Sequence, residues 1–228
     1  GDYLVRALLS RQHRPVLLVR SGSEQRVHSV DQCHTITGDI DDSAALKALV
    51  DGCDAAIYNI GILRECSAEG ITFERMQLDG AQRFVAAAEA AGVRRLLLMS
   101  ANGVRADGTP YQRSKFLAEQ AALQSSLQVT VFRPSVIFGD PGTKHEFATQ
   151  LLQDMVRSPL PAVNFFSAFG QHRGPVRMSP VHVEDVADAF AEALEGDNRV
   201  GKRYTLAGPE ILSWGEMIRR VAASVGAR

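Results

Sequence analysis

The sequence lacks an excess of charge of either sign. Its 25 lysine and arginine residues balance 26 aspartate and glutamate residues, which gives a formal net charge of -1. Nucleic acids and anionic membrane surfaces both favour partners with a strong basic excess. The charge balance therefore argues against both as the main partner, and we expect a small-molecule substrate whose identity the sequence does not give.

Cysteines and long apolar runs are also scarce. Cys33, Cys53 and Cys66 are odd in number and have no CxxC spacing, which argues against a disulfide framework and a zinc site. The 6 histidines lack metal-ligand spacing, so no metal is expected. The apolar run from Ala55 to Leu63 is too short to span a bilayer, and the first residues already indicate a helix rather than a targeting segment. We therefore expect a cytoplasmic protein without a membrane span.

Short apolar segments instead alternate with longer periodic ones. Strands are expected at 16–19, 55–59, 95–99 and 129–132, and helices at 44–50, 74–91 and 111–123. Strands that are apolar on both faces and separated by helices form a parallel sheet covered on both sides. We predict an α/β fold, a Rossmann-type doubly wound parallel sheet, with a dinucleotide-binding core at 1–133 that lacks its first strand. Residues 134–228 are predicted to form a small C-terminal substrate lobe interleaved with the last core elements.

The first helix and the strand after it carry candidate phosphate ligands. Gly1 precedes that helix, at the place where a dinucleotide fold has the last glycine of its phosphate loop. Arg20 and Ser21 follow the strand at 16–19, at the tip where NAD-specific proteins place a carboxylate against the ribose 2′-hydroxyl. A guanidinium can bind a 2′-phosphate through two charge-assisted hydrogen bonds. The pattern favours NADP(H) over NAD(H), although a solvated surface arginine remains the alternative.

Two further segments come at the ends of predicted strands. Asp39 of Gly38-Asp39-Ile40 can accept a hydrogen bond from an adenine amino group while a backbone N–H donates to the ring. The alternative is a turn or helix-capping aspartate. Asn59-Ile60-Gly61 ends the next strand, and its glycine permits close backbone approach to a ribose.

Tyr111 and Lys115 are four residues apart and so share one face of a helix. An ammonium beside a phenol favours the phenolate and lowers the pKa of the tyrosine. Such a tyrosine can exchange a proton with a carbonyl or an alcohol while hydride moves to or from a nicotinamide. The lysine can also hold the nicotinamide ribose. We therefore interpret the pair as catalytic, with chance spacing as the alternative.

These motifs together resemble those of the extended and atypical short-chain dehydrogenase/reductases. The resemblance is closest to the group of the NADPH-binding accessory subunit of respiratory complex I and its bacterial relatives. Five segments carry it: Gly38-Asp39-Ile40, Asn59-Ile60-Gly61, Tyr111-Gln112-Arg113-Ser114-Lys115, Arg133 to Gly139, and Val181 to Val186. The resemblance implies a Rossmann core and a small C-terminal substrate lobe. It also implies that Pro134, Ser135 and Val136 contact the cofactor.

The sequence departs from the family pattern at two positions. Active members place a serine or threonine near the end of the strand at 95–99 to polarise the carbonyl, whereas Ala101 aligns there. Ser100, one residue earlier, is the remaining candidate for that role. Gln77 stands where many members carry an asparagine in the long helix.

Three functions follow from this resemblance. The first is an NADP(H)-dependent oxidoreductase acting on a carbonyl or alcohol, with Tyr111, Lys115 and Ser100 as its catalytic residues. The second is a non-catalytic NADP(H)-binding assembly or redox-sensor protein. The third is a nucleotide-sugar epimerase or dehydratase. The partner alternatives are a homodimer and association with a larger respiratory assembly.

Overall fold

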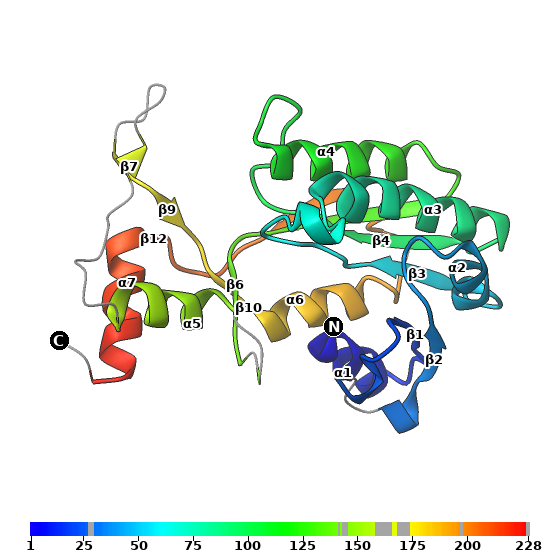
Figure 1. Cartoon of the computed structure of the whole chain (residues 1–228), viewed down its shortest axis with the longest axis horizontal. Coiled ribbons are helices and arrows are strands. Elements are labelled where there is room, and N and C mark those ends of the chain that lie inside the picture. Colours follow the sequence, from blue (N-terminus) through cyan, green and yellow to red (C-terminus); the bar gives the residue numbers. More distant parts are fainter. Residues whose placement is uncertain are drawn as a thin grey trace. The chain divides into compact units, whose positions relative to one another are not determined.

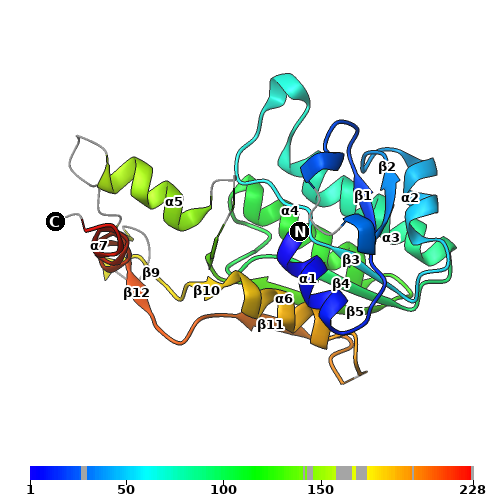
Figure 2. The same ribbon diagram turned by 90° about the horizontal axis from the view of Figure 1, so that it is seen from below.

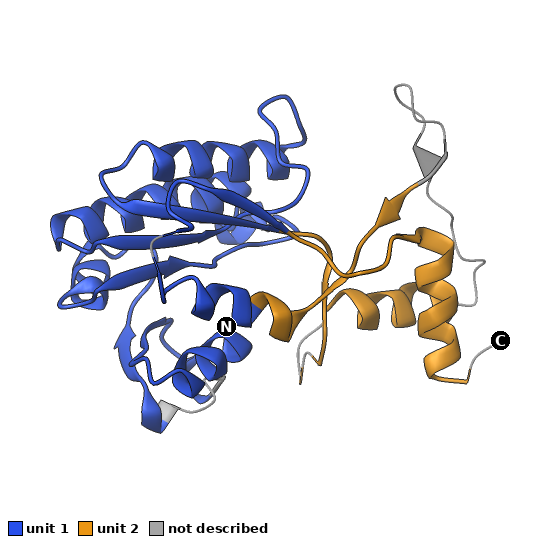
Figure 3. Ribbon diagram, turned by 180° about the vertical axis from the view of Figure 1, so that it is seen from behind, with its two compact units in different colours: residues 1–133, 187–205 blue, residues 134–186, 206–228 orange. Residues whose placement is uncertain are grey.

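The chain divides into two compact units. The structure, a computed structural model, describes residues 1–26, 30–140, 142, 146–157, 166–167, 174–196 and 198–226. Unit 1 comprises Gly1–Arg133 and Ala187–Thr205, and unit 2 comprises Pro134–Val186 and Leu206–Arg228 (Figure 3). The chain thus leaves unit 1 near Arg133, returns at Ala187 and leaves again after Thr205.

Unit 1 is built on parallel strands. Four of them form one sheet in the order β11-β5-β4-β3, and two more form a separate sheet, β1-β2. Their bounds are β1 (Val16–Val19), β2 (His34–Thr37), β3 (Ala55–Tyr58), β4 (Arg95–Met99), β5 (Gln128–Pro134) and β11 (Arg203–Leu206). The pairs β1/β2, β3/β4 and β4/β5 are parallel. Parallel strands end at the same edge of a sheet, so the segments after β3 and β4 lie side by side.

Helices cover both faces of the larger sheet. Leu96, Leu97 and Leu98 of β4 are all buried, which requires cover on both sides of the strand. Helices α3 (Gly80–Ala90) and α4 (Pro110–Leu123) lie over one face, and α1 (Asp2–Ser10) lies with α6 (Val183–Glu192) over the other (Figures 1 and 2). Ala7 and Leu8 of α1 pack against Ala187 and Ala191 of α6. The predicted doubly wound α/β fold with a parallel sheet is confirmed.

The remaining helical segments of unit 1 are short. They are α2 (Ser43–Val50), η1 (Glu24–Arg26), η2 (Val30–Gln32) and η3 (Ser67–Glu69). The side chain of Asp42 caps α2 by accepting from the N–H groups of Ala44 and Ala45. The capping role considered for Asp39 therefore belongs to Asp42.

The helix predicted at 74–91 is confirmed in extent, but it changes type along its length. A π-helical stretch, η4 (Glu74–Asp79), precedes α3. The buried Tyr58 hydroxyl donates to the carbonyl oxygen of Met76 at 2.6 Å, so this carbonyl has a partner outside the helix. A Cβ atom at Gly80 would lie 2.6 Å from the same hydroxyl, so only glycine lets the helix approach β3 this closely.

Unit 2 is made of short strands and two main helices. The strand pairs are β6 (Ile137–Phe138) with β10 (Val181–His182), β9 (Arg177–Met178) with β12 (Leu212–Ser213), and β7 (Phe166–Ser167) with β8 (Gly174–Pro175). The helical segments are α5 (Phe147–Leu151), π-helical η5 (Leu152–Val156) and α7 (Trp214–Ser224). The rings of Phe147 and Trp214 are 5.9 Å apart, centroid to centroid, and join α5 to α7.

None of the helices in the described parts of the chain is both long and apolar enough to cross a membrane.

Candidate functional site

The carboxyl ends of β3 and β4 form the centre of the candidate site. Asn59, Ile60 and Gly61 follow β3, and Ser100 follows β4. The ammonium of Lys115, on α4, donates to the carbonyl oxygens of Ile60 at 3.1 Å and Met99 at 3.0 Å. The lysine therefore bridges the two strand ends at the edge where α/β sheets bind ligands.

The start of α4 is fixed by its own sequence. Thr109 and Gln112 form a capping box, in which the Thr109 hydroxyl accepts from the Gln112 N–H and the Gln112 side chain accepts from the Thr109 N–H. Pro110 occupies the first turn, where a missing N–H costs nothing. The amide of Gln112 also donates to the Gly103 carbonyl at 2.9 Å. Tyr111 is thus held in the first turn of α4, and Lys115 lies one turn later.

Lys115 is an unusual residue to find in a helix–sheet interface. It is only 5% exposed. Loss of solvent lowers the pKa of its ammonium to about 8, and the neighbouring carboxylate of Glu119 acts in the opposite direction. An ammonium has three N–H donors, and the two carbonyls use two of them. Contact of the third N–H with a ribose hydroxyl stays a prediction.

Gly61 leaves room for the Lys115 ammonium. A Cβ atom at position 61 would lie 3.2 Å from the Lys115 ammonium. The sequence suggested that this glycine permits approach to a ribose. In the structure, it lies against the lysine.

Tyr111 is half-buried and its ring packs edge-on against Phe73, with the centroids 5.6 Å apart. Burial raises the pKa of the Tyr111 phenol. The effect of Lys115 on the pKa of this phenol stays a prediction, because the cause found for the shift is burial. A raised pKa keeps the phenol protonated at neutral pH.

Ser100 is 4% exposed. Its N–H donates to the carbonyl oxygen of Phe132 at 2.7 Å. Its hydroxyl oxygen is buried and has no hydrogen-bond partner among the described residues. A buried unpaired hydroxyl is uncommon and marks a place where a ligand group can bind. Ser100 is thus at the predicted strand end, but its hydroxyl must turn outward to reach a carbonyl.

Gln77 connects the segment after β3 to helix α4. It is fully buried within η4. Its amide nitrogen donates to the carbonyl oxygen of Ile62 at 2.9 Å, and its amide oxygen accepts from the hydroxyl of Ser114 at 2.9 Å. It therefore ties the segment after β3 to the helix that carries Tyr111 and Lys115. Sequence reasoning noted Gln77 only as a departure from the family pattern and missed this connection.

The predicted adenine and phosphate ligands lie on β1, β2 and α1. Arg20 and Ser21 follow β1 and are exposed, and no ion pair of Arg20 is found among the described residues. Asp39 follows β2, and its carboxylate accepts from the N–H of Ile40 at 2.6 Å. The Ile40 N–H is thus paired with the Asp39 carboxylate and cannot donate to an adenine ring while this hydrogen bond is present. Gly1 is the N-cap of α1, and its carbonyl accepts from the N–H of Val5.

The aspartates beside Asp39 have other partners. Asp41 forms ion pairs with Arg75 of η4 and Arg83 of α3. Asp42 caps α2. Asp39 is therefore the one of the three whose carboxylate is bound only to its own neighbour among the described residues, which suits a role in binding a ligand.

Pro134, Ser135 and Val136 belong to unit 2. The N–H of Ser135 donates to the carbonyl of Leu206 at 2.8 Å, and the carbonyl of Val136 accepts from the N–H of Val181 at 2.9 Å. Their contact with the cofactor stays a prediction.

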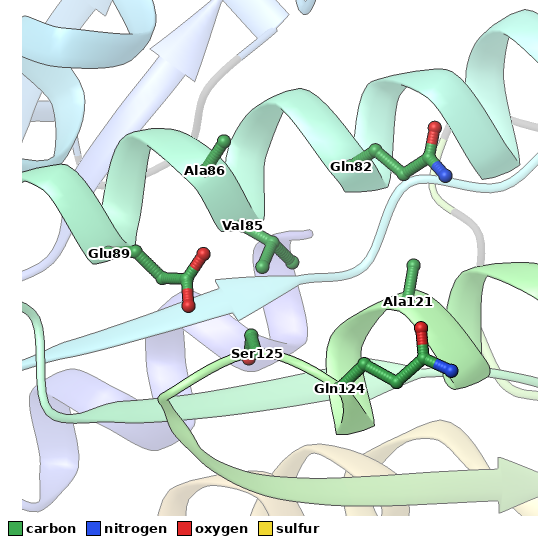
Figure 4. Close-up of a pocket in the computed structure, with 7 residues that line it drawn as sticks. All are labelled: Gln82, Val85, Ala86, Glu89, Ala121, Gln124 and Ser125. Carbon is green, nitrogen blue, oxygen red and sulfur yellow. The ribbon is translucent and has the colours of Figure 1, made fainter.

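A hollow between α3 and α4 is separate from these residues (Figure 4). Its lining residues are Gln82, Val85, Ala86, Glu89, Ala121, Gln124 and Ser125. None of the predicted site residues is among them. Within the described parts of the chain, no group of three or more His, Cys, Asp or Glu side chains is placed to hold a metal ion.

Comparisons with known proteins agree with a nicotinamide cofactor. Residues 1–158 match the protein family described as NAD(P)H-binding. The chain is 32% identical to a ceramide reductase of Caulobacter vibrioides over 188 residues, which cover 82% of this chain and 55% of that protein. It is 25% identical to subunit 9 of the NADH dehydrogenase [ubiquinone] 1 alpha subcomplex, a mitochondrial protein of Arabidopsis thaliana, over 229 residues that cover 95% of this chain and 53% of the subunit. The chain thus spans about half the length of these curated relatives.

Solved structures show the same fold. The structure of MoeE5 in complex with UDP-glucuronic acid and NAD has a TM-score of 0.78 and 21% sequence identity, and the match covers 99% of this chain and 79% of MoeE5. The predicted Rossmann-like α/β fold is therefore confirmed.

Proposed function

Because the chain belongs to the NAD(P)H-binding family, we propose that it acts as an NADP(H)-dependent oxidoreductase of the short-chain dehydrogenase/reductase type. Its substrate is a ketone or the corresponding secondary alcohol. One observation carries the proposal: the buried Lys115 ammonium is held at the ends of β3 and β4, one helical turn from Tyr111. A purely structural helix position rarely holds a buried ammonium on backbone carbonyls.

We assign reduction as the direction of the reaction, and burial, which raises the pKa of Tyr111, keeps its phenol protonated. When bound, the reduced nicotinamide supplies the hydride that adds to the carbonyl carbon. Tyr111 is the general acid, because its protonated phenol can give a proton to the carbonyl oxygen. Lys115 stabilises the phenolate that remains, and its third N–H orients the ribose. A proton from water then restores the phenol.

Selectivity for NADP(H) rests on Arg20 and Ser21. Both are exposed at the end of β1, and neither is a carboxylate that would repel a 2′-phosphate. The guanidinium can bind the phosphate with two hydrogen bonds, and the serine hydroxyl can add a third.

A second candidate is an NADP(H)-binding subunit without catalysis. It is supported by Ala101 at the carbonyl-polarising position and by the buried hydroxyl of Ser100. The likeness to the Arabidopsis NADH dehydrogenase subunit supports it as well. In this alternative the cofactor stabilises the fold and the partner is a larger assembly.

The two candidates differ in the effect of Tyr111→Phe. We expect the full-length protein to oxidise NADPH with at least one member of a ketone panel, measured by the absorbance of the reduced cofactor. Tyr111→Phe should lower kcat by roughly 10²–10⁴-fold and leave NADPH affinity nearly unchanged, because only the proton path is lost. Tyr204→Phe, in β11, is the matched control and should keep full activity. Equal kcat for Tyr111→Phe and the unmodified protein would remove Tyr111 from the mechanism.

A further inference from the structure

Helix α4 buries two opposite charges against the sheet. Lys115 and Glu119 are four residues apart on its buried face, and the other buried residues of this helix are Ser114, Ala118 and Ala122. Helix faces that pack on a sheet are usually apolar, and lysine and glutamate are rarely buried unless paired. The proposed reaction uses Lys115 and gives no role to Glu119.

Glu119 is fully buried and each of its carboxylate oxygens is bound. Arg133 donates to it through Nε at 2.8 Å and through Nη2 at 2.6 Å, so the pair is bidentate. Arg203 adds a third contact from Nε at 3.3 Å. Arg133 lies on β5 and Arg203 on β11, which are neighbouring strands. The carboxylate is therefore fixed against the sheet, one helical turn beyond Lys115.

The charges around Lys115 come from several elements. The carbonyl oxygens of Ile60 and Met99 face it from the ends of β3 and β4. Its own helix contributes the phenol of Tyr111 and the carboxylate of Glu119, and η4 contributes the neutral amide of Gln77, through Ser114.

Arg133 on β5 and Arg203 on β11 both pair with Glu119. The Glu119 carboxylate thus offsets two guanidinium groups and also acts on the Lys115 ammonium, one helical turn away. Without its charge, these three cations would lose the carboxylate that they share.

We propose that Glu119 is a positioning residue for Lys115: its carboxylate, held by Arg133 and Arg203, keeps the ammonium ionised where it reaches both strand ends. The catalytic meaning of this role rests on the proposed function, because there Lys115 serves Tyr111 and the ribose. The electrostatic coupling itself can be measured without cofactor or substrate.

The test is a titration of Lys115 by NMR, in protein labelled with ¹³C at the lysine ε-carbons. The sequence holds four lysines, and Lys115→Gln identifies the signal of residue 115. In Glu119→Gln, which keeps the size of the side chain and removes its charge, we expect the pKa of Lys115 to fall by about one unit or more. In Arg203→Gln, which removes a positive charge from a half-exposed position, we expect a smaller rise.

An unchanged Lys115 titration in Glu119→Gln would overturn the proposal. Should Glu119→Gln fail to fold, Arg203→Gln decides alone: a rise supports the proposal, and no change or a fall overturns it. A second readout is the pH dependence of NADPH affinity. If Glu119 were merely structural, Glu119→Gln would lower the NADPH affinity equally at every pH. The proposed role predicts instead that the affinity lost at alkaline pH is lost at a lower pH in Glu119→Gln than in the unmodified protein. Failure of the unmodified protein to bind NADPH would count against the proposed function and leave the lysine titration as a separate result.

Discussion

At the scale of single residues, Lys115 is the residue on whose position the proposed chemistry depends most. Its ammonium is buried and is held by two backbone carbonyls rather than by a carboxylate. Burial of an unpaired ammonium is expensive, so the fold accepts a cost at this point. Such local costs are typical of functional sites.

That cost predicts how stability depends on pH. The pKa of Lys115 falls from 10.5 to about 8 on folding, so the unfolded chain binds more protons between these values. The free energy of unfolding contributed by this group therefore rises as pH increases from about 8 to about 10.5. Between pH 7 and pH 9.5 the unmodified protein should gain about 2 kcal/mol relative to Lys115→Met, as measured by urea unfolding. A stability difference that stays constant over this range would show that the buried ammonium does not titrate as described.

Arg20 determines the cofactor preference in this account. Removal of a charge-assisted phosphate contact costs about 1.5–3 kcal/mol, which is roughly ten- to a hundred-fold in affinity. We expect Arg20→Ala to weaken NADPH binding by that factor and to leave NADH binding unchanged. Arg14→Ala, in the turn before β1, is the control and should change neither affinity. If the unmodified protein binds NADPH and NADH equally, the assignment of Arg20 is wrong.

At the scale of elements, η4 is the part of the fold that sequence patterns could not predict. The periodicity of 74–91 fits one continuous helix, and it gave the extent of the segment correctly. The π-helical start depends on Tyr58, whose hydroxyl donates a hydrogen bond to the carbonyl of Met76, 18 residues later in the chain. A contact of this kind depends on tertiary structure and leaves no local signal. π-Helical turns are common at functional sites, and here the turn contains Gln77.

The role of Gln77 leads to a prediction about this element. Gln77→Leu would remove the partner of the Ile62 carbonyl and leave the Ser114 hydroxyl with only the carbonyl of Tyr111. We expect a loss of about 1–3 kcal/mol in the free energy of unfolding. NADPH affinity should also fall, because the segment after β3 loses its tie to α4. Gln82→Leu, on the exposed side of α3, is the matched control, for which calorimetry should give a change below about 0.5 kcal/mol. Equal melting temperatures for the two variants would contradict this role of Gln77.

The candidate site was predictable where it depends on spacing along the chain. The helix of Tyr111 and Lys115 and the strand ends at Asn59 and Ser100 follow from hydrophobic periodicity. The partners of Lys115 are backbone carbonyls. Every residue has one, so the sequence does not show which of them the lysine contacts. Glu119 stands four residues after Lys115, a spacing that was visible, but its pairing with Arg203 joins residues 84 apart. Contacts of that range require the folded structure.

At the scale of the whole molecule, the chain crosses between its units more than once. Residues 187–205 complete the sheet and helices of unit 1, whereas Pro134, Ser135 and Val136 belong to unit 2. The loss of alternation after Pro134 indicated where unit 2 begins. The return of α6 and β11 to unit 1 depends on burial of residues such as Ala187, Ala191 and Phe190, which only the fold identifies.

The central claim is that this protein catalyses the transfer of hydride from NADPH to the carbonyl carbon of a ketone. It is tested most directly with NADPH that carries deuterium at both C4 positions, incubated with the full-length protein and a panel of ketones. Mass spectrometry of the products should find one deuterium on the carbinol carbon of an alcohol, and Tyr111→Phe should slow this transfer by roughly 10²–10⁴-fold. If the protein binds the deuterated NADPH and no product from any ketone carries deuterium, the oxidoreductase account is contradicted and the non-catalytic NADP(H)-binding role takes its place.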